Sequence, residues 1–282
     1  MKVLRTAAEL REWRGGSGRL GFVPTMGALH AGHLSLVERS RSETDATVVS
    51  IFVNPTQFGP HEDFAKYPRQ ESIDLALLER AGAAAAFVPS VEEIYPPGDT
   101  ARIDPGPIAA PLEGAARPGH FTGVATVVAK LFDIVRPDVA YFGQKDYQQL
   151  RVLQTMARER YPNIRVVGCP IVREDDGLAL SSRNAYLTEQ QRRDALALSR
   201  GLFRARELWV EGVRHPDRLR NAVRRYTDGP GIEVEYVSAA DPITLAELHG
   251  PATRAVLSLA ARVGTTRLID NVLLGMDVSE LS

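Results

Sequence analysis

Two histidines in a short turn are the first residues that could do chemistry. His30 and His33 stand three positions apart in "TMGALHAGH", between the apolar run "RLGFVP" and the helix-like "LSLVERS". If a strand leads here into a helix, both imidazoles lie at the carboxyl edge of a parallel sheet, where the free N–H groups and dipole of the helix favour an anion. Gly27 and Gly32 let a phosphate or nucleobase approach the backbone closely. The turn therefore indicates a nucleotide or other anion site.

Two other interpretations of the histidine pair stay open. An isolated H-x-x-H is often no more than two half-exposed polar residues at a helix start. A zinc site would need a third ligand, and the remaining histidines form no second compact pair. These are His61, His120, His215 and His249.

A second cluster, "FGQKDYQQL", covers residues 142–150. A strand is expected to end at Gly143 and a helix to open with Lys145 and Asp146. Lys145 can serve as a mobile positive charge for phosphate, while Asp146 can accept from ribose hydroxyls or simply cap the helix. Gln149, one helical turn further on, is placed to face the same crevice.

A third cluster lies in "REDDGLALSSRN", residues 173–184. Ser181, Ser182 and Arg183 follow an expected turn, and the planar guanidinium matches phosphate oxygens in two places. We expect these residues to form a lid over the phosphates, although a plain polar loop is the alternative.

Two weaker stretches offer polar donors after expected strand or loop ends. Asn54 and Gln57 in "SIFVNPTQFGP" and Arg117 and His120 in "RPGHFTGV" could bind a hydroxyl or carboxylate. Ordinary turn chemistry would explain the same residues.

The elements that position these clusters are typical of an α/β protein. Short apolar runs at 19–24, 46–53, 83–89, 138–143 and 163–168 alternate with segments of helical period, which predicts βαβ units and a parallel sheet. Thr6 with Glu9 and Thr188 with Gln191 match the capping-box spacing. The segment 121–135 is apolar on nearly every side and should be buried, whereas the Pro/Gly-rich 95–114 should be irregular.

The pattern changes after about residue 171. Charged helices are predicted within 188–212 and 217–228, followed by strands at 232–238, 254–262 and 265–274. We therefore expect a Rossmann-like domain over 1–171 and a smaller α+β domain over 172–282 that acts as a lid.

The composition narrows the class of partner. The chain of 282 residues has 34 basic and 35 acidic residues and a net charge of -1, which favours neither nucleic acid nor an anionic membrane. Its single cysteine, Cys169, excludes an intrachain disulfide and is expected to be buried filler. No apolar run approaches the roughly 18 residues of a membrane helix. We expect a cytoplasmic protein that acts on small molecules.

Taken together, the motifs resemble a known family. "FVPTMGALHAGH", "SIFVNPTQF", "YPR", "ARPGHFTGV", "FGQKDYQQL" and "DGLALSSRN", in this order, are similar to the pantothenate synthetases, the AMP-forming pantoate–β-alanine ligases. The similarity extends to "RLIDN" near the C-terminus. It implies a doubly wound parallel sheet of the nucleotidylyl-transferase type with a smaller C-terminal α+β domain. It also implies ATP and Mg²⁺, a pantoyl-adenylate intermediate with release of pyrophosphate and AMP, and a homodimer.

The resemblance also implies roles for individual residues. His30, His33, Lys145 and Arg183 match the catalytic groups, with His33 as the acid at the departing group. Gln57 and Gln149 match the pantoate-binding glutamines, and Gln57 also lies near the β-alanine site. Asp74 matches a magnesium-associated acid, although it could equally be a solvent-facing helix position. The ATP-binding residues would be Met26, Gly27, Ala28, Leu29, His30, Ala31, Gly32, His33, Gly143, Gln144, Lys145, Asp146, Val172, Leu180, Ser181, Ser182 and Arg183.

Two positions depart from the family pattern. Thr56 replaces a common methionine, which would loosen the apolar wall of the pantoate pocket, and Gln144 replaces a common glutamate beside Lys145. Two other functions remain as alternatives: a nucleotidyltransferase that acts on a phosphorylated small molecule, and a nucleotide sensor that binds without turnover.

Overall fold

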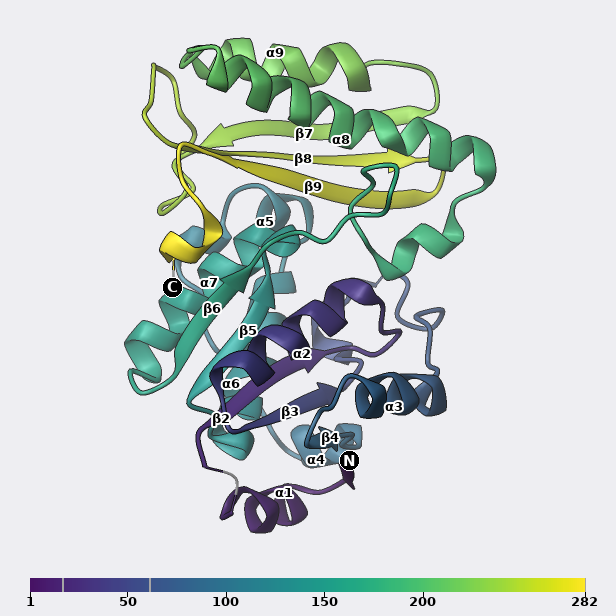
Figure 1. The fold of residues 1–282 in the computed structure, drawn as a ribbon, viewed down its shortest axis with the longest axis vertical. Coiled ribbons are helices and arrows are strands. Elements are labelled where there is room, and N and C mark those ends of the chain that lie inside the picture. The colour runs from purple at the N-terminus through teal and green to yellow at the C-terminus, as the bar shows by residue number, and fades with distance from the viewer. Residues whose placement is uncertain (17, 61, 282) are drawn as a thin grey trace. The chain divides into compact units, whose positions relative to one another are not determined.

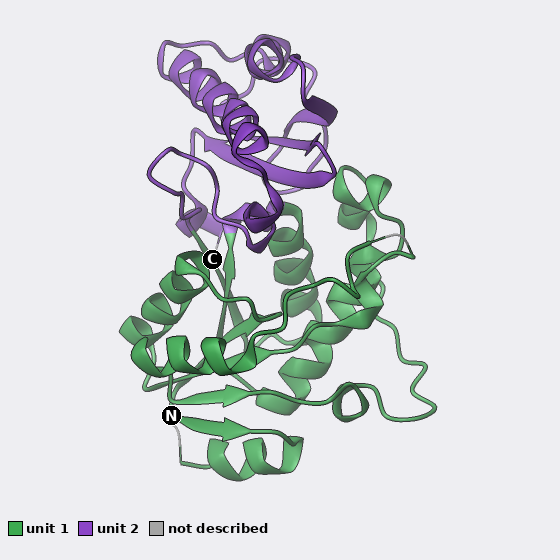
Figure 2. Cartoon of the chain, turned by 90° about the vertical axis from the view of Figure 1, so that its right-hand side faces the viewer, with its two compact units in different colours: residues 1–143, 148–169, 282 green, residues 144–147, 170–281 purple. Residues whose placement is uncertain are grey.

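The structure is a computed structural model that describes residues 1–16, 18–60 and 62–281. Its contacts divide the chain into two compact units (Figure 2). Unit 1 contains residues 1–143 and 148–169, and unit 2 contains residues 144–147 and 170–281. Unit 2 therefore includes a short segment that lies between two stretches of unit 1 in the sequence. The expected domain boundary after residue 171 stays a prediction.

Within the described residues, unit 1 is built on a six-stranded parallel sheet with strand order β1-β4-β3-β2-β5-β6. The strands are β1 (Lys2–Leu4), β2 (Leu20–Thr25), β3 (Ala46–Ile51), β4 (Ala85–Phe87), β5 (Val139–Gly143) and β6 (Arg165–Cys169). From β2 the chain builds outward through β3 to β4, and then returns to β5 on the other side of β2. The strand order therefore reverses between β2 and β5, and such a switch point is where open α/β sheets bind ligands.

Helices cover both faces of this sheet. In Figure 1, α2 crosses in front of the strands and α6 passes behind them. The helices of unit 1 are α1 (Ala7–Arg14), α2 (Ala31–Glu43), α3 (Glu71–Arg80), α4 (Val91–Ile94), α5 (Glu113–Ala116), α6 (His120–Val135) and α7 (Tyr147–Arg160), whose first residue belongs to unit 2. Short 3₁₀ turns lie at Pro55–Gln57 and Pro107–Ala109. Because both faces are covered, strand residues such as Phe22, Val49 and Tyr141 are fully buried.

Unit 2 is an α+β layer structure. Its described part contains a three-stranded antiparallel sheet of β7 (Ile232–Ala240), β8 (Ala255–Val263) and β9 (Thr266–Leu274). Helices α8 (Glu189–Val210) and α9 (Pro216–Thr227) pack on this sheet (Figure 1). The apolar face of α8 buries Leu202 and Trp209 in one core with Leu257 and Leu259 of β8. Further 3₁₀ turns span Gln144–Asp146, Ser182–Tyr186 and Val278–Leu281.

Most of the predicted elements are confirmed. Thr6 and Thr188 form the two expected capping boxes, and α6 is buried along nearly its whole length. The stretch 95–114 is irregular apart from one 3₁₀ turn and the start of α5. Cys169 is buried, as predicted. In the described parts of the chain, every helix is too short or too polar to cross a bilayer.

Two local predictions are wrong or incomplete. The edge strand β1 is absent from the predicted elements, because three residues are too few to show a period. The helix after β5 does not open with Lys145 and Asp146: a 3₁₀ turn covers Gln144–Asp146, and α7 begins at Tyr147. The cause is a side chain from β9, because Asn271 Nδ2 donates to the carbonyls of Gln144 and Lys145. These carbonyls therefore have a partner outside the helix.

Candidate active site

The two predicted histidines lie at the carboxyl end of β2, where α2 begins. His30 is the N-cap residue, with extended backbone, and His33 is the third residue of the helix. Their ring centroids are 4.1 Å apart and the ring planes are inclined by 35°. The predicted position of the pair at a strand-to-helix turn is confirmed.

A reciprocal pair of hydrogen bonds orients the two rings. The Gly32 N–H donates to His30 Nδ1 (3.2 Å), and the His30 N–H donates to His33 Nδ1 (3.4 Å). A ring nitrogen that accepts from an N–H carries no proton, so each neutral imidazole carries its hydrogen on Nε2. In this tautomer Nε2 is the ring nitrogen that can donate, and such a donor suits an anion. A proton on Nδ1 would face a backbone N–H and break the cap.

Asp74 from α3 fixes the backbone just before His30. Its Oδ2 accepts from the Ala28 N–H and its Oδ1 from the Leu29 N–H, both at 2.9 Å. Ala28 has φ 51°, a left-handed conformation that costs free energy in a residue with a side chain. Gly27 has φ 79°, and a β-carbon there would lie 2.9 Å from Asp74 Oδ2. The carboxylate therefore holds a strained turn in place.

The burial of Asp74 decides between its two expected environments. The residue is 1% exposed, so the solvent-facing alternative is wrong. Each carboxylate oxygen accepts one backbone N–H, so the structure shows Asp74 supporting the turn, and its association with magnesium stays a prediction. Nowhere in the described residues do three or more His, Cys, Asp or Glu side chains gather as a metal site. His61, considered above as a zinc ligand, lies outside the described residues.

Gln57 ends the 3₁₀ turn after β3, and Asn54 sets the orientation of its amide. Asn54 Nδ2 donates to Gln57 Oε1 (3.0 Å), which leaves Gln57 Nε2 as the outward donor. Nε2 approaches Met26 Sδ at 3.2 Å, so the glutamine and the histidine-containing loop lie side by side in unit 1. The two motifs are 31 residues apart in sequence.

Asn54 is itself held from several sides. Its Nδ2 also donates to the Gly123 carbonyl (3.2 Å), and its Oδ1 accepts from the Thr56 hydroxyl and the Tyr95 hydroxyl, both at 2.9 Å. The residue is 1% exposed. Thr56, one of the departures from the family pattern, thus takes part in a polar network behind Gln57.

His120, Arg117 and Glu62 support the backbone of Gln57. A guanidinium can only donate, so His120 Nε2 accepts from Arg117 (3.0 Å) and its Nδ1–H donates to the Gln57 carbonyl (2.8 Å). Burial and then the charge of Arg117 lower the pKa of His120 from 6.5 to about 4. Burial raises the pKa of Glu62, but the hydrogen bonds and charge of Arg117 outweigh it and lower this pKa to about 2. A neutral imidazole and an ion pair therefore hold the loop near neutral pH.

Gly123 allows α6 to pack directly on the same loop. A β-carbon at Gly123 would clash with the Thr56 carbonyl and lie 2.8 Å from Gln57 Cα. Since backbone cannot move aside as a flexible side chain does, only glycine fits here without displacing Gln57.

The expected phosphate-binding lysine lies in unit 2. Lys145 and Asp146 occupy the 3₁₀ turn after Gly143, and Lys145 Nζ lies 3.9 Å from Asp146 Oδ1. The ammonium is therefore at the long limit of an ion pair. Gln149 follows within α7, in unit 1, and is partly exposed.

The stretch 172–184 forms a folded loop in unit 2. The Leu180 N–H donates to the Val172 carbonyl (3.0 Å), and Arg173 and Ala179 form an antiparallel bridge. Ser181 caps the following 3₁₀ turn by accepting from the Arg183 N–H (3.3 Å). The two serines and the arginine thus lie on a short turn with defined ends.

The structure brings the predicted residues together in two groups. Hydrogen bonds join the turn of residues 26–33 to Gln57 and Asp74 in unit 1. Unit 2 contains both residues 144–146 and the loop 172–183. The convergence of both groups on one triphosphate stays a prediction. Sequence reasoning missed the supporting residues Tyr95, Glu62 and Gly123, and it used Asn271 only as part of a resemblance.

Comparison with known proteins decides the family. A family model described as pantoate-beta-alanine ligase matches residues 2–273 of the chain. The chain belongs to the pantoate-β-alanine ligase family. It is therefore an enzyme of the ligase class.

Individual relatives agree over nearly the whole chain. A pantothenate synthetase from Roseiflexus sp. (strain RS-1) is 55% identical over 276 residues, which cover 97% of this chain and 99% of the relative. A solved pantothenate synthetase from Thermus thermophilus has 47% identity and a TM-score of 0.92, covering 96% of this chain and 99% of that one. A pantoate-beta-alanine ligase from Francisella tularensis, complexed with beta-gamma ATP and beta-alanine, has 36% identity and a TM-score of 0.81, covering 99% and 100% of the two chains. The α/β fold with a smaller antiparallel unit is thus the fold of this family.

Proposed function

We propose that this chain joins (R)-pantoate to β-alanine in an ATP-dependent reaction that passes through pantoyl adenylate. The observation that carries the chemistry is the pair of imidazoles at the start of α2, each with Nδ1 engaged by a backbone N–H. This arrangement presents Nε2–H donors at a helix N-terminus beside the switch point of the sheet, which suits a nucleotide phosphate.

The reaction has two steps. A carboxylate oxygen of pantoate attacks the α-phosphorus of ATP, the bond from phosphorus to the bridging oxygen breaks, and pyrophosphate leaves. The amine of β-alanine then attacks the acyl carbon of the adenylate, the carbon–oxygen bond breaks, AMP leaves and the nitrogen loses a proton. Transfer at phosphorus depends mainly on alignment and on neutralising negative charge. Hydrogen-bond donors and cations should therefore outnumber covalent nucleophiles in the site.

The imidazoles supply part of this neutralisation. As neutral rings, His30 and His33 donate hydrogen bonds to phosphate oxygens as charge develops there. Full proton transfer from His33 to the leaving group would require its Nδ1 to gain a proton and release the His30 N–H. We therefore assign His33 mainly to hydrogen-bond donation. The acid role goes further, because it requires His33 to transfer its proton completely to the leaving group. Lys145 and Arg183 would add positive charge from unit 2.

We propose that Gln57 holds the acid substrate. Its Oε1 accepts from Asn54, so we assign the substrate contact to the Nε2 donor, which suits a carboxylate or hydroxyl oxygen of pantoate. Its nearness to Met26 puts that donor beside the nucleotide loop, and the same position suits β-alanine in the second step. Gln149 from α7 is the second proposed pantoate contact.

Several further properties rest on the family resemblance. We propose that Mg²⁺ enters with the ATP phosphates, that the enzyme is a cytoplasmic homodimer, and that unit 2 closes over the nucleotide as a lid. Sedimentation measures the dimer, and X-ray scattering with and without ATP measures the closure. Identical scattering profiles would count against the lid.

The decisive assay is exchange of labelled pyrophosphate into ATP. Exchange that requires both pantoate and Mg²⁺, followed by pantothenate formation when β-alanine is added, is the expected result. Exchange without any amide product would favour a nucleotidyltransferase. ATP binding without exchange, in folded protein, would favour a nucleotide sensor and overturn the proposal.

A further inference from the structure

We propose that Asp270 and Asn271, adjacent residues of β9, are positioning residues that hold the two nucleotide-facing segments of unit 2. The inference rests on the proposed function, because it takes Lys145 and the turn at 181–183 as phosphate contacts. Neither Asp270 nor Asn271 needs to touch a substrate. They act by fixing the backbone from which the contacting side chains project.

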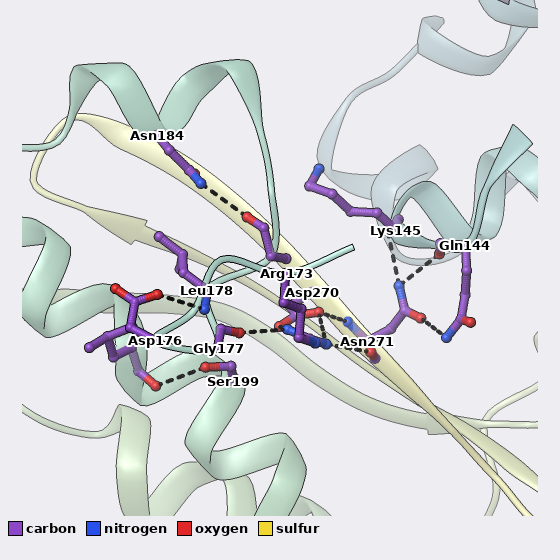
Figure 3. A network of polar contacts seen from close by, with 12 residues as sticks. Gln144, Lys145, Arg173, Asp176, Gly177, Leu178, Asn184, Ser199, Asp270 and Asn271 are labelled. Atoms are coloured by element: carbon purple, nitrogen blue, oxygen red, sulfur yellow. Dashed lines mark hydrogen bonds and ion pairs between the residues drawn. The ribbon is translucent and has the colours of Figure 1, made fainter. Parts of the chain in front are cut away.

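Asn271 is hydrogen-bonded to the segment that carries Lys145. Its Nδ2 donates to the carbonyl of Gln144 (3.0 Å) and to the carbonyl of Lys145 (2.9 Å), and its Oδ1 accepts from Gln144 Nε2 (3.1 Å) (Figure 3). Asn271 is 2% exposed. One primary amide therefore satisfies two consecutive carbonyls and one side chain, which defines the 3₁₀ turn of residues 144–146.

Asp270 forms an ion pair with Arg173, at the start of the loop that leads to the two serines and Arg183. Its carboxylate accepts two hydrogen bonds from Arg173, Nη1 to Oδ2 at 2.7 Å and Nη2 to Oδ1 at 2.9 Å (Figure 3). Arg173 Nη1 also donates to the Gly177 carbonyl (3.1 Å), and the guanidinium lies 4.8 Å from the centroid of the Phe203 ring. Asp270 is 4% exposed. A two-bond ion pair of this kind restricts direction as well as distance.

The adjacency of the two residues links the two segments. Successive side chains of a strand point to opposite faces, so Asp270 and Asn271 reach different partners from one piece of backbone. Asp270 Oδ1 also accepts the Asn271 N–H at 2.7 Å. A shift of β9 would therefore move both segments together, because both are hydrogen-bonded to the same strand.

Glutamine at position 144 fits this assignment. A glutamate there would present a carboxylate oxygen to Asn271 Oδ1 in place of the Nε2–H donor. The amide of Gln144 instead completes the hydrogen bonding of Asn271. Gln144, which departs from the family pattern, thus has a hydrogen-bond partner in this chain, Asn271.

The test is a set of single variants assayed by pantoate-dependent pyrophosphate exchange. Asn271→Ala leaves two carbonyls without their donor, and a displacement near 1 Å in an aligned site can lower the rate about 100-fold. We expect kcat/KM for ATP to fall on the order of 10- to 100-fold. KM for pantoate should change by less than about threefold, because the positioned group contacts ATP. Asn271→Ser keeps one donor and should give an intermediate loss.

A matched control separates this effect from general loss of stability. Glu235→Gln breaks ion pairs with Arg262 and Arg267 on the same three-stranded sheet, away from residues 144–146. This variant should keep wild-type exchange even if its melting temperature falls. Every assay is run at a temperature at which circular dichroism shows a folded variant.

A double-variant cycle gives the readout that a merely structural role would not move. If Asn271 acts through Lys145, adding Asn271→Ala to Lys145→Ala lowers exchange little beyond the single Lys145 variant. If the two losses multiply, or if Asn271→Ala and Asn271→Ser retain wild-type kinetics, the inference is overturned. Failure of the proposed function looks different, because the wild-type protein itself would then show no pantoate-dependent exchange.

Discussion

Replacing Asp74 by asparagine tests what its carboxylate does in the fold. The variant has nearly the same shape, but it keeps one oxygen and turns an NH₂ group toward one of the two backbone N–H donors at Ala28 and Leu29. A hydrogen bond to a charged group contributes about 1.5–3 kcal/mol, and a buried donor left without an acceptor costs about as much. We therefore expect the free energy of unfolding to fall by about 2 kcal/mol.

The same loss should appear in several measurements. A change of this size lowers the melting temperature by roughly 5 °C in a protein of this length. Asp74→Ala removes both acceptors and should cost about 4 kcal/mol. Because Ala28 is then free to leave its left-handed conformation, the maximal rate of pantoate-dependent exchange should fall as well. Urea unfolding and exchange at saturating substrates measure the two effects.

A magnesium titration supplies the outcome that would refute this reasoning. If Asp74 only holds the turn, Asp74→Asn leaves the Mg²⁺ concentration for half-maximal exchange within about twofold of wild type, whereas loss of a ligand or its support typically costs about 10- to 100-fold in metal affinity. Wild-type stability combined with an increase in that concentration of about tenfold or more, again on the scale of ligand loss, would make the carboxylate a metal ligand. Glu79→Gln, on the same helix with a side chain that is 69% exposed, serves as the control.

Three other residues of unit 1, His33, Gly123 and His120, can be tested by substitution. His33→Ala should lower the adenylation rate about 100-fold while ATP affinity changes much less, since its hydrogen bond strengthens as charge develops; equal losses in single-turnover rate and ATP binding would contradict this. Gly123→Ala should cost about 1–3 kcal/mol and raise KM for pantoate by displacing Gln57, whereas an unchanged KM would mean that α6 shifts instead. Between pH 7 and pH 5 the unfolded chain protonates His120 but the folded chain does not, so unfolding free energy should fall by about 2 kcal/mol, and His120→Asn should remove that slope in urea titrations.

The local sequence pattern, meaning apolar runs and capping residues, predicts most of the fold. The central strands are continuous apolar runs because both faces of a parallel sheet are covered, and residues 19–24 show this plainly around β2. The capping boxes at Thr6 and Thr188 depend on contacts within four residues, so the sequence contains all of their causes. The edge strand β1 depends instead on pairing with the distant β4, where Lys2 lies opposite Ala85, and carries too short a signal.

The sequence predicts the site only where nearby residues, through their spacing, bring functional side chains together. The two imidazoles share one helix start, so spacing alone brings them together. Asp74 reaches Ala28 across 46 residues, and Asn271 reaches Gln144 across 127. Neither distance leaves a periodic signal. The resemblance associates the carboxylate of Asp74 with a metal, whereas its hydrogen bonds to the turn depend on tertiary structure that local sequence does not reveal.

The single cysteine has a practical consequence for labelling. Burial raises the pKa of the Cys169 thiol to about 11, so at neutral pH it is protonated and reacts slowly with maleimides. A cysteine introduced at an exposed position such as Val210, which is 81% exposed, would therefore take up a fluorophore without background from the native thiol. A pair of such fluorophores, one on each unit, would report any movement of one unit against the other during turnover.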